Sequence, residues 1–295
     1  KPMVLVYHDI LEKVAEGNNY KVAISTSKFQ QQIKYLNQRY NFISLDQFID
    51  WKINNAGLPT NPLLLTFDDG HINNYLEALK ILNKYKIKGV FFIKTGFLGT
   101  YNENYFEELI NILETDKIKN NLITKIDYNR IYNHFRKLKF KNQISLIKTT
   151  KKENLKIESP RDEMKFLHMD EKMCKELIRE GHSVQSHSVN HFILSSLSNS
   201  DSKDELNDSF NFINNKFNRS LAIAYPFGDP NYDFGIREYN LAKDIGYKLG
   251  FIGEVNECGQ FINKEMNSYS LPRFGMVNVD FKYFQMLLSG IRIKK

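Results

Sequence analysis

Cysteine is scarce in this sequence, and its two copies, Cys174 and Cys258, form no spacing motif. This argues against the disulfide framework of small secreted domains. No apolar run reaches the length of a membrane span. No signal peptide is visible, although the chain begins at Lys1 and not at Met. A cytoplasmic location and a location in the cell envelope therefore both stay open.

Excess charge is also modest, with a formal net charge of +7 over 295 residues. The basic residues occur in short runs such as Arg136–Lys139, without the clustering and interleaved aromatic residues of a nucleic-acid patch. We therefore expect no nucleic-acid partner, while peripheral contact with an anionic membrane surface or substrate stays open.

A hydrophobic content of 42% is ample for a core. The length fits one large α/β domain or two modest ones.

Strand and helix patterns alternate along most of the chain. Strands are predicted at 3–8, 42–45, 62–69, 89–93, 183–187, 221–225, 247–252 and 269–274. Helices are predicted from a cap at Ser27, through Phe48 and Trp51, at 72–86, 170–180 (ending at Gly181), 201–217 and 237–245, and from Asp280. The repeated βα unit indicates an α/β fold with a parallel sheet or barrel. The rhythm breaks over 96–170, which we interpret as a helical insertion within a single domain of residues 1–295.

The stretch Pro62–Gly70, with sequence PLLLTFDDG, is the centre of this organisation. Its leucines predict a short strand buried on both faces, which should end at a site. Asp68 and Asp69 follow at once, and on an extended chain adjacent side chains point to opposite sides. One carboxylate could hold a metal while its neighbour faces a reacting water. The alternative is an Asp-Asp-Gly turn with solvated carboxylates.

A second group of polar residues follows the predicted strand at 183–187. In the sequence SHSVNH, His187 and His191 are four residues apart, so one helical turn would place both imidazoles on one face. Two neutral imidazoles and a carboxylate suit one borderline divalent metal ion and leave positions open for water and substrate. Zn²⁺ fits such a ligand set, with Ni²⁺, Co²⁺ or Fe²⁺ as alternatives. A solvated pair of histidines is the alternative interpretation.

Together these motifs resemble the polysaccharide deacetylase family, the NodB-homology carbohydrate esterases. The resemblance rests on TFDDG at 66–70, SHSVNH at 186–191 and AYPFG at 224–228, in that order. It implies a distorted (β/α) barrel and metal-dependent hydrolysis of N-acetyl groups on sugars. By match to the motifs, Asp69, His187 and His191 would be the metal ligands and Asp68 the general base.

The sequence departs from the usual family pattern in its catalytic acid. Members of this family supply that acid from a Leu-x-His motif near the C-terminus, but this chain has no histidine after His191. The N-terminal sequence LVYHD at 5–9 resembles instead the circularly permuted branch that includes the deacetylases of poly-N-acetylglucosamine biofilm synthesis. His8 would then be the acid that protonates the leaving amine. The alternative is a hydrogen-bonded core histidine.

The third motif also departs, because the arginine that usually opens it is replaced by Ala224 or Tyr225. Arg273 could supply the missing positive charge and hold Asp68 ionised, or it could be a surface arginine. The backbone N–H of Phe227 is a candidate for the oxyanion site. Tyr225 and Phe227 could form a wall on which a sugar stacks, and core packing explains them equally well.

The remaining histidines receive simpler interpretations. His134 and His168 are expected to be exposed in or beside the insertion, and His182 to be structural. His71 could touch substrate.

Taken together, the sequence predicts a hydrolase acting on an N-acetylated amino-sugar glycan or its precursor. The alternatives are a deformylase acting on a formamido sugar and an inactive carbohydrate-binding protein.

Overall fold

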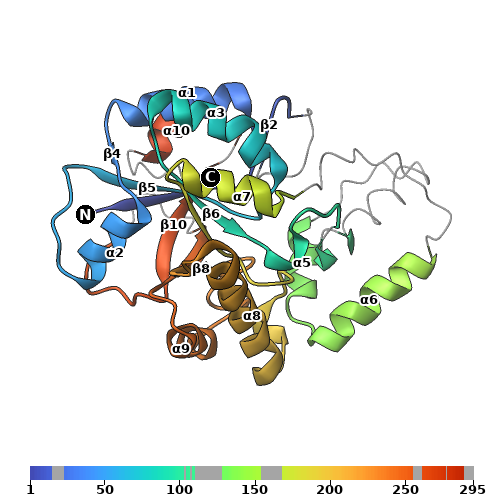
Figure 1. The fold of residues 1–295 in the computed structure, drawn as a ribbon. Coiled ribbons are helices and arrows are strands. Elements are labelled where there is room, and N and C mark those ends of the chain that lie inside the picture. Colours follow the sequence, from blue (N-terminus) through green and yellow to red (C-terminus); the bar gives the residue numbers. More distant parts are fainter. Residues whose placement is uncertain are drawn as a thin grey trace.

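Parallel strands close into a barrel at the centre of this computed structural model (Figure 1). The structure describes residues 1–14, 23–102, 104–106, 108–109, 128–153, 168–254, 261–276 and 278–288. The ring consists of β1 (Met3–Tyr7), β10 (Leu271–Gly275), β9 (Leu249–Glu254), β8 (Ala222–Ala224), β7 (Ser183–Ser186), β6 (Val90–Ile93) and β5 (Pro62–Phe67). Because β1 pairs with both β10 and β5, the ring is closed. The predicted (β/α) barrel is confirmed.

Shorter strands and the helices surround this ring. β4 (Asn41–Phe42) extends the barrel beside β5, and β2 (Asp9–Leu11) pairs separately with β3 (Ala23–Ser25). The helices are α1 (Thr26–Asn37), α2 (Leu45–Ile53), α3 (Leu79–Tyr85), α5 (Tyr128–Phe135), α6 (Phe140–Glu153), α7 (Glu171–Arg179), α8 (Asn199–Phe217), α9 (Ile236–Ile245) and α10 (Phe281–Leu288), with short turns η1 (Asn74–Ala78), η2 (Thr95–Phe97) and η4 (Leu194–Ser196). None of the described helices combines the length and apolarity needed to span a bilayer.

Alternating side chains of the strands build two layers of core. On β5, Leu63 and Leu65 belong to a cluster with residues of α1 and α3, while Leu64 belongs to a second cluster with core residues of the other barrel strands. Because successive side chains of a strand point to opposite faces, this second cluster fills the barrel. Its base is closed by α2, whose Phe48 ring lies 6.0 Å from that of Phe251. The opposite rim, where the parallel strands end, carries Asp68 and His187.

Two helix details differ from the sequence prediction. The first helix is capped by Ser25 and not by Ser27, because the Ser25 hydroxyl accepts the hydrogen bond from the Lys28 N–H at 3.3 Å. The helix after β5 begins with a π-helical turn, η1, before α3 continues. Asn74, the first residue of that turn, is buried and donates from its side chain to the His8 carbonyl oxygen at 2.8 Å. The wider turn thus ties this helix to the end of β1.

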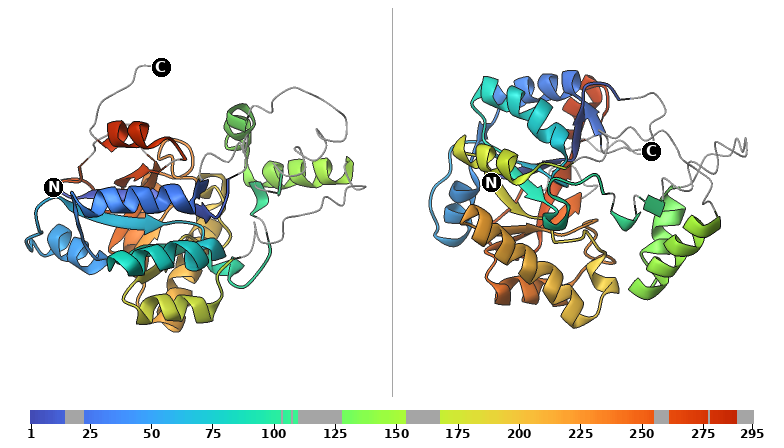
Figure 2. Two further views of the ribbon diagram at one scale, coloured as in Figure 1. Left: turned by 90° about the horizontal axis from the view of Figure 1, so that it is seen from above. Right: turned by 45° about the vertical axis from the view of Figure 1, so that its right-hand side comes forward.

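Helices α5 and α6 lie beside the barrel, on the side toward which the central strands run (Figures 1 and 2). The ring of Tyr132 stacks 5.6 Å from that of Phe227, in the loop after β8. Arg136 donates from Nε and Nη2 to the two carboxylate oxygens of Asp233, at 3.0 and 2.7 Å. These contacts join α5 and the residue after it to the loop that follows β8. The division into one domain with an insertion at 96–170 stays a prediction, and residues 110–127 and 154–167 lie outside the described part.

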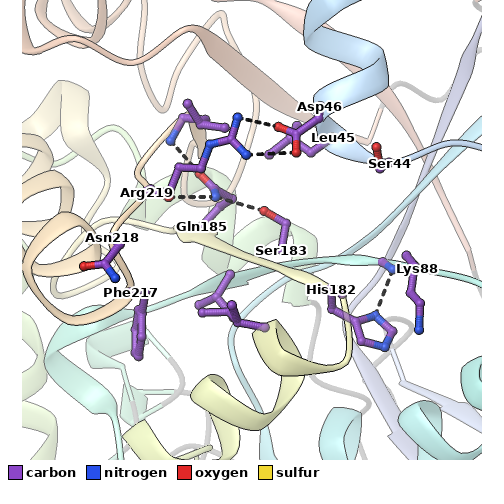
Figure 3. A pocket seen from close by; sticks show the side chains of 15 residues that line it. Ser44, Leu45, Asp46, Lys88, His182, Ser183, Gln185, Phe217, Asn218 and Arg219 are labelled. Carbon is purple, nitrogen blue, oxygen red and sulfur yellow. Dashed lines mark hydrogen bonds and ion pairs between the residues drawn. The ribbon is translucent and has the colours of Figure 1, made fainter.

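A cavity of about 340 Å³ opens at the amino ends of β6 and β7. Figure 3 shows His182, Gln185 and the Arg219–Asp46 ion pair in its wall. The parallel strands carry Asp68 and His187 at their other ends, so this cavity lies at the opposite end of the barrel from the predicted chemistry.

Candidate active site

The two adjacent carboxylates lie where β5 ends at the rim. The Asp68 N–H donates to the Tyr7 carbonyl oxygen at 2.9 Å, which continues the pairing of β5 with β1. Asp69 leaves the strand with φ of 70° and Gly70 follows with φ of 69°, so the chain turns sharply. A Cβ at Gly70 would lie 3.1 Å from Cγ2 of Ile93, so this position requires glycine both for its backbone angle and for space. The turn gives each carboxylate its own set of partners.

Asp68 is held by Arg273, which reaches it across β1 from the middle of β10. Nη1 and Nη2 of Arg273 each lie 2.6 Å from an oxygen of Asp68, and both residues are buried. The Arg273 Nε donates to the Ile252 carbonyl oxygen at 2.9 Å, which fixes the guanidinium. Burial alone would raise the pKa of Asp68, but Arg273 and His187 more than offset this, and the pKa is lowered. The structure thus places Arg273 in the core of the site and not on the surface.

Asp69 faces the two histidines of the second motif. Its Oδ1 lies 3.7 Å from His187 Nε2 and 3.4 Å from His191 Nε2. The residues from His187 to His191 form a loop and not the helical turn predicted from their spacing, since Ser188 and His191 have positive φ angles of 60° and 56°. The imidazoles still converge, with ring centroids 4.8 Å apart. The predicted grouping is observed, while the predicted local geometry was wrong.

These three side chains fit a divalent metal ion. Their candidate ligand atoms all lie within 4.8 Å of one another. Tetrahedral donors about 2.0–2.1 Å from Zn²⁺ are about 3.3 Å apart, close to the observed spacing of oxygen and nitrogen. His187 Nδ1 lies 2.7 Å from the Ala224 carbonyl oxygen. Because a carbonyl only accepts, Nδ1 carries the proton and Nε2 presents its lone pair toward Asp69.

The charge states also suit metal binding. Burial lowers the pKa of His187 and lowers that of His191 well below its usual value, so both imidazoles are neutral at pH 7. Burial would raise the pKa of Asp69, but Lys94 and His191 outweigh it and hold the pKa well below its usual value. A carboxylate and two neutral imidazoles are the deprotonated ligands that a metal ion requires.

Glu205, on α8, supports the histidine loop and was not predicted from the sequence. One of its oxygens accepts from the backbone N–H groups of Val189 and Asn190, at 3.1 and 2.8 Å. The His191 N–H donates to the Ser188 hydroxyl at 3.1 Å. These bonds satisfy the backbone of a loop that lacks helical hydrogen bonds, and they fix its shape. No pattern around position 205 distinguishes this glutamate from a solvated helix residue.

His8 follows β1 directly and lies at the same rim. In the pairing of β1 with β5, Tyr7 stands opposite Phe67, so His8 and Asp68 follow at matching positions. The side chain of His8 is partly exposed, and its charge contributes to lowering the pKa of Asp68. β1 lies beside β10, as the permuted arrangement requires. The permutation itself stays a prediction.

Tyr225 and Phe227, the two aromatic residues of the third motif, occupy different environments in the structure. Phe227 is partly buried with φ of 61°, and its ring lies 4.8 Å from that of His191. Tyr225 is 1% exposed and stacks on Phe234 at 4.4 Å, in the cluster between the barrel, α8 and α9. Of the two interpretations left open for Tyr225, the structure supports core packing and not sugar stacking, because its ring is buried in this cluster. Phe227 differs because the strand ends at Ala224 and the positive φ of Phe227 turns the chain. Phe227 remains at the rim.

Two histidines form an unexpected buried pair beside Asp69. His71 Nε2 lies 3.8 Å from Asp69 Oδ2, and the rings of His71 and His168 meet edge to face at 5.1 Å. The prediction that His168 is exposed was wrong, since it is 3% exposed and forms a β-bridge with His71. Burial lowers the pKa of His71 to about 3.

The other two histidines behave as predicted. His134 is exposed on α5. His182 is structural, since its Nδ1 accepts from the Gly89 N–H at 3.0 Å. Neither of them reaches the rim.

Comparison with known proteins agrees with this geometry. The sequence model of the polysaccharide deacetylase family matches residues 56–250. The chain is 21% identical to the protein YxkH of Bacillus subtilis over 272 residues, which are 92% of this chain and 69% of that protein. A poly-beta-1,6-N-acetyl-D-glucosamine N-deacetylase of Staphylococcus aureus is 38% identical over 88 residues, which are 30% of this chain and 29% of that protein.

Solved structures share the fold over nearly the full chain. The deacetylase PplD of Streptococcus pyogenes, in complex with acetate, has a TM-score of 0.66 at 22% identity, covering 99% of this chain and 98% of PplD. IcaB from Ammonifex degensii has a TM-score of 0.63 at 18% identity, covering 98% of this chain and 96% of IcaB.

Proposed function

The chain belongs to the polysaccharide deacetylase family, and we propose that it is a metal-dependent hydrolase that removes N-acetyl groups from amino sugars of a bacterial surface polysaccharide or its precursor. One observation carries this proposal. Asp68, ionised and fixed by Arg273, lies beside the ligand set of Asp69, His187 and His191 at one rim of the barrel. The similarity to a poly-beta-1,6-N-acetyl-D-glucosamine N-deacetylase supports an amino-sugar substrate.

Asp69, His187 and His191 would hold one divalent ion, with zinc as the first choice for this ligand set and Ni²⁺, Co²⁺ or Fe²⁺ as alternatives. When bound, such an ion supplies a Lewis acid that polarises an acyl oxygen and lowers the pKa of water. Asp68 accepts a proton from the water that attacks the acyl carbon. The pairing with Arg273 keeps Asp68 ionised and aimed before the substrate arrives.

His8 completes the reaction on the leaving side. Amide cleavage breaks the bond between the acyl carbon and the sugar nitrogen, and the nitrogen leaves poorly without a proton. Protonated His8 donates that proton, so the products are acetate and a free amino sugar. The backbone N–H of Phe227, in the loop beside His191, is our candidate donor to the oxyanion. The ring of Phe227 would border the sugar.

Release of acetate from a panel of N-acetylated sugars tests the proposed function. We expect acetate from β-1,6-linked N-acetylglucosamine oligomers when zinc or cobalt is added to chelator-treated protein, and none without metal. Formate from N-formylated oligomers without acetate would assign the deformylase activity. Oligomer binding without release of either acid would identify a carbohydrate-binding protein and refute the hydrolase.

Replacement of His8 tests the acid directly. We expect His8→Ala to lower turnover of the N-acetyl substrate by on the order of 10²-fold while metal content is unchanged, because the leaving nitrogen loses its proton donor. The loss should be smaller on an activated ester, whose leaving group needs less protonation. His134→Ala, which removes an exposed histidine on α5, is the control and should change neither rate. Equal losses on amide and ester would show that His8 is structural.

A further inference from the structure

Lys94, the residue after β6, places a positively charged side chain against Asp69. Its side chain is 0% exposed and its Nζ lies 3.5 Å from Asp69 Oδ1, the oxygen that also faces His187 and His191. Nζ makes no hydrogen bond to any residue of the described part of the chain. A buried ammonium without hydrogen bonds is costly, so its position is explained by the carboxylate.

The backbone fixes Lys94 in this place. The His187 N–H donates to the Ile93 carbonyl oxygen at 2.9 Å, and the Thr95 N–H donates to the Ser188 carbonyl oxygen at 3.1 Å. Lys94 is therefore bracketed by the loop that carries the two histidines. On its other side its Nζ lies 5.4 Å from the centre of the Phe97 ring. The ammonium is enclosed between Asp69 and an aromatic wall.

The two carboxylates of the site are thus paired with one buried cation each. Asp68 is matched by Arg273 and Asp69 by Lys94. Within the described residues, the other ion-pair partners of Asp69 are the imidazoles of His71, His187 and His191. A divalent ion that enters the ligand set therefore adds two positive charges to a group of carboxylates and cations that is already balanced.

We propose that Lys94 is a built-in counter-cation that holds Asp69 in place before metal binds and that lowers the affinity of the site for the metal ion. This inference rests on the proposed metal site. A positive charge next to Asp69 repels a second cation, and it also satisfies Asp69 when no ion is present. Lys94 thus raises the stability of the metal-free protein and lowers the affinity for the metal ion. A lysine with a merely structural role would raise the stability without changing the affinity.

The test compares metal-free wild type with Lys94→Met, which keeps the length of the side chain but removes its charge. We expect the dissociation constant for Zn²⁺, measured by competition with a chromophoric chelator, to fall by on the order of tenfold or more. We expect the thermal midpoint without metal to fall as well, because Asp69 loses its counter-charge. Added zinc should then raise the midpoint more in the variant than in the wild type.

Lys52→Met is the matched control, because Lys52 is a buried lysine on α2 whose Nζ donates to the Lys264 and Met266 carbonyl oxygens at the closed end of the barrel. It should lower stability and leave zinc affinity unchanged. Lys94→Gln, which can still hydrogen-bond Asp69, repeats the affinity test without relying on Met. In wild type, zinc should shift the ¹⁵Nζ resonance of Lys94 and not that of Lys52.

Unchanged or weaker zinc binding in the Lys94 variants, or an unshifted Lys94 resonance, would overturn the inference. Failure of the metal site itself gives a different result. In that case a His187→Ala/His191→Ala variant would bind zinc as tightly as wild type.

Discussion

Asp68→Asn is expected to lower turnover by on the order of 10²–10⁴-fold while leaving the fold and the metal content intact. An amide cannot take up the proton of an attacking water at neutral pH. Its oxygen can still accept a hydrogen bond from Arg273, so the guanidinium keeps a partner. Acetate release under saturating metal, together with elemental analysis and thermal unfolding, checks all parts of the expectation.

The matched control for this change is Asp46→Asn, which alters an exposed aspartate at the closed end of the barrel. It should retain wild-type turnover. If Asp68→Asn stayed within a few-fold of wild type, the role of base would pass to another group. A loss of metal together with the loss of rate would instead make Asp68 a ligand.

Removing the histidine ligands is expected to abolish activity by removing the metal. In a His187→Ala/His191→Ala variant only Asp69 remains of the proposed ligand set, and one carboxylate does not hold a borderline ion against a chelator. We expect elemental analysis after dialysis to give less than a tenth of the wild-type metal content. Acetate release should fall to background, since neither the water nor the acyl oxygen is activated.

The control for that variant is His182→Ala, which removes a buried histidine at the closed end of the barrel. It should lose stability and keep its metal. Full metal occupancy in the double variant would refute the assignment of His187 and His191. Rates near wild type at zero occupancy would refute metal-dependent hydrolysis.

The alternation of short apolar runs with helix patterns was enough to predict a parallel sheet or barrel, and the resemblance to the family selected the barrel. The grouping of Asp69, His187 and His191 was predicted from the spacing of the histidines and from the match to the family motifs, and the rule that parallel strands end at one rim explains why these side chains meet. The same rule would have identified Lys94, which directly follows the strand Val90–Ile93. A lysine after a strand is usually solvated, so the sequence alone does not distinguish Lys94 from a surface residue.

Other features depend on contacts that sequence periodicity does not encode. The spacing of His187 and His191 suggested a helical turn, but backbone bonds to Glu205 and to residues 93–96 hold a loop there instead. His168 looked exposed because the segment before it is polar, yet it pairs with His71 from a distant part of the chain. The sequence alone allowed Arg273 to be either a partner of Asp68 or a surface residue. The pairing of β10 with β1 decides between them, because it brings Arg273 close to Asp68.

Closure of the ring by β1 and β10 also governs when a newly made chain can become active. Leu5 pairs with Phe274, so β1 can complete its side of the ring only after the ribosome has made β10. Contacts between such distant residues form late, because a long loop must be ordered first. Arg273 lies on that last strand, so the partner of Asp68 arrives only then. A nascent chain that ends before β10 would already carry Asp69, His187 and His191, but its Asp68 would have no guanidinium to hold it. The ion pair that holds Asp68 therefore forms only after β10 has been synthesised.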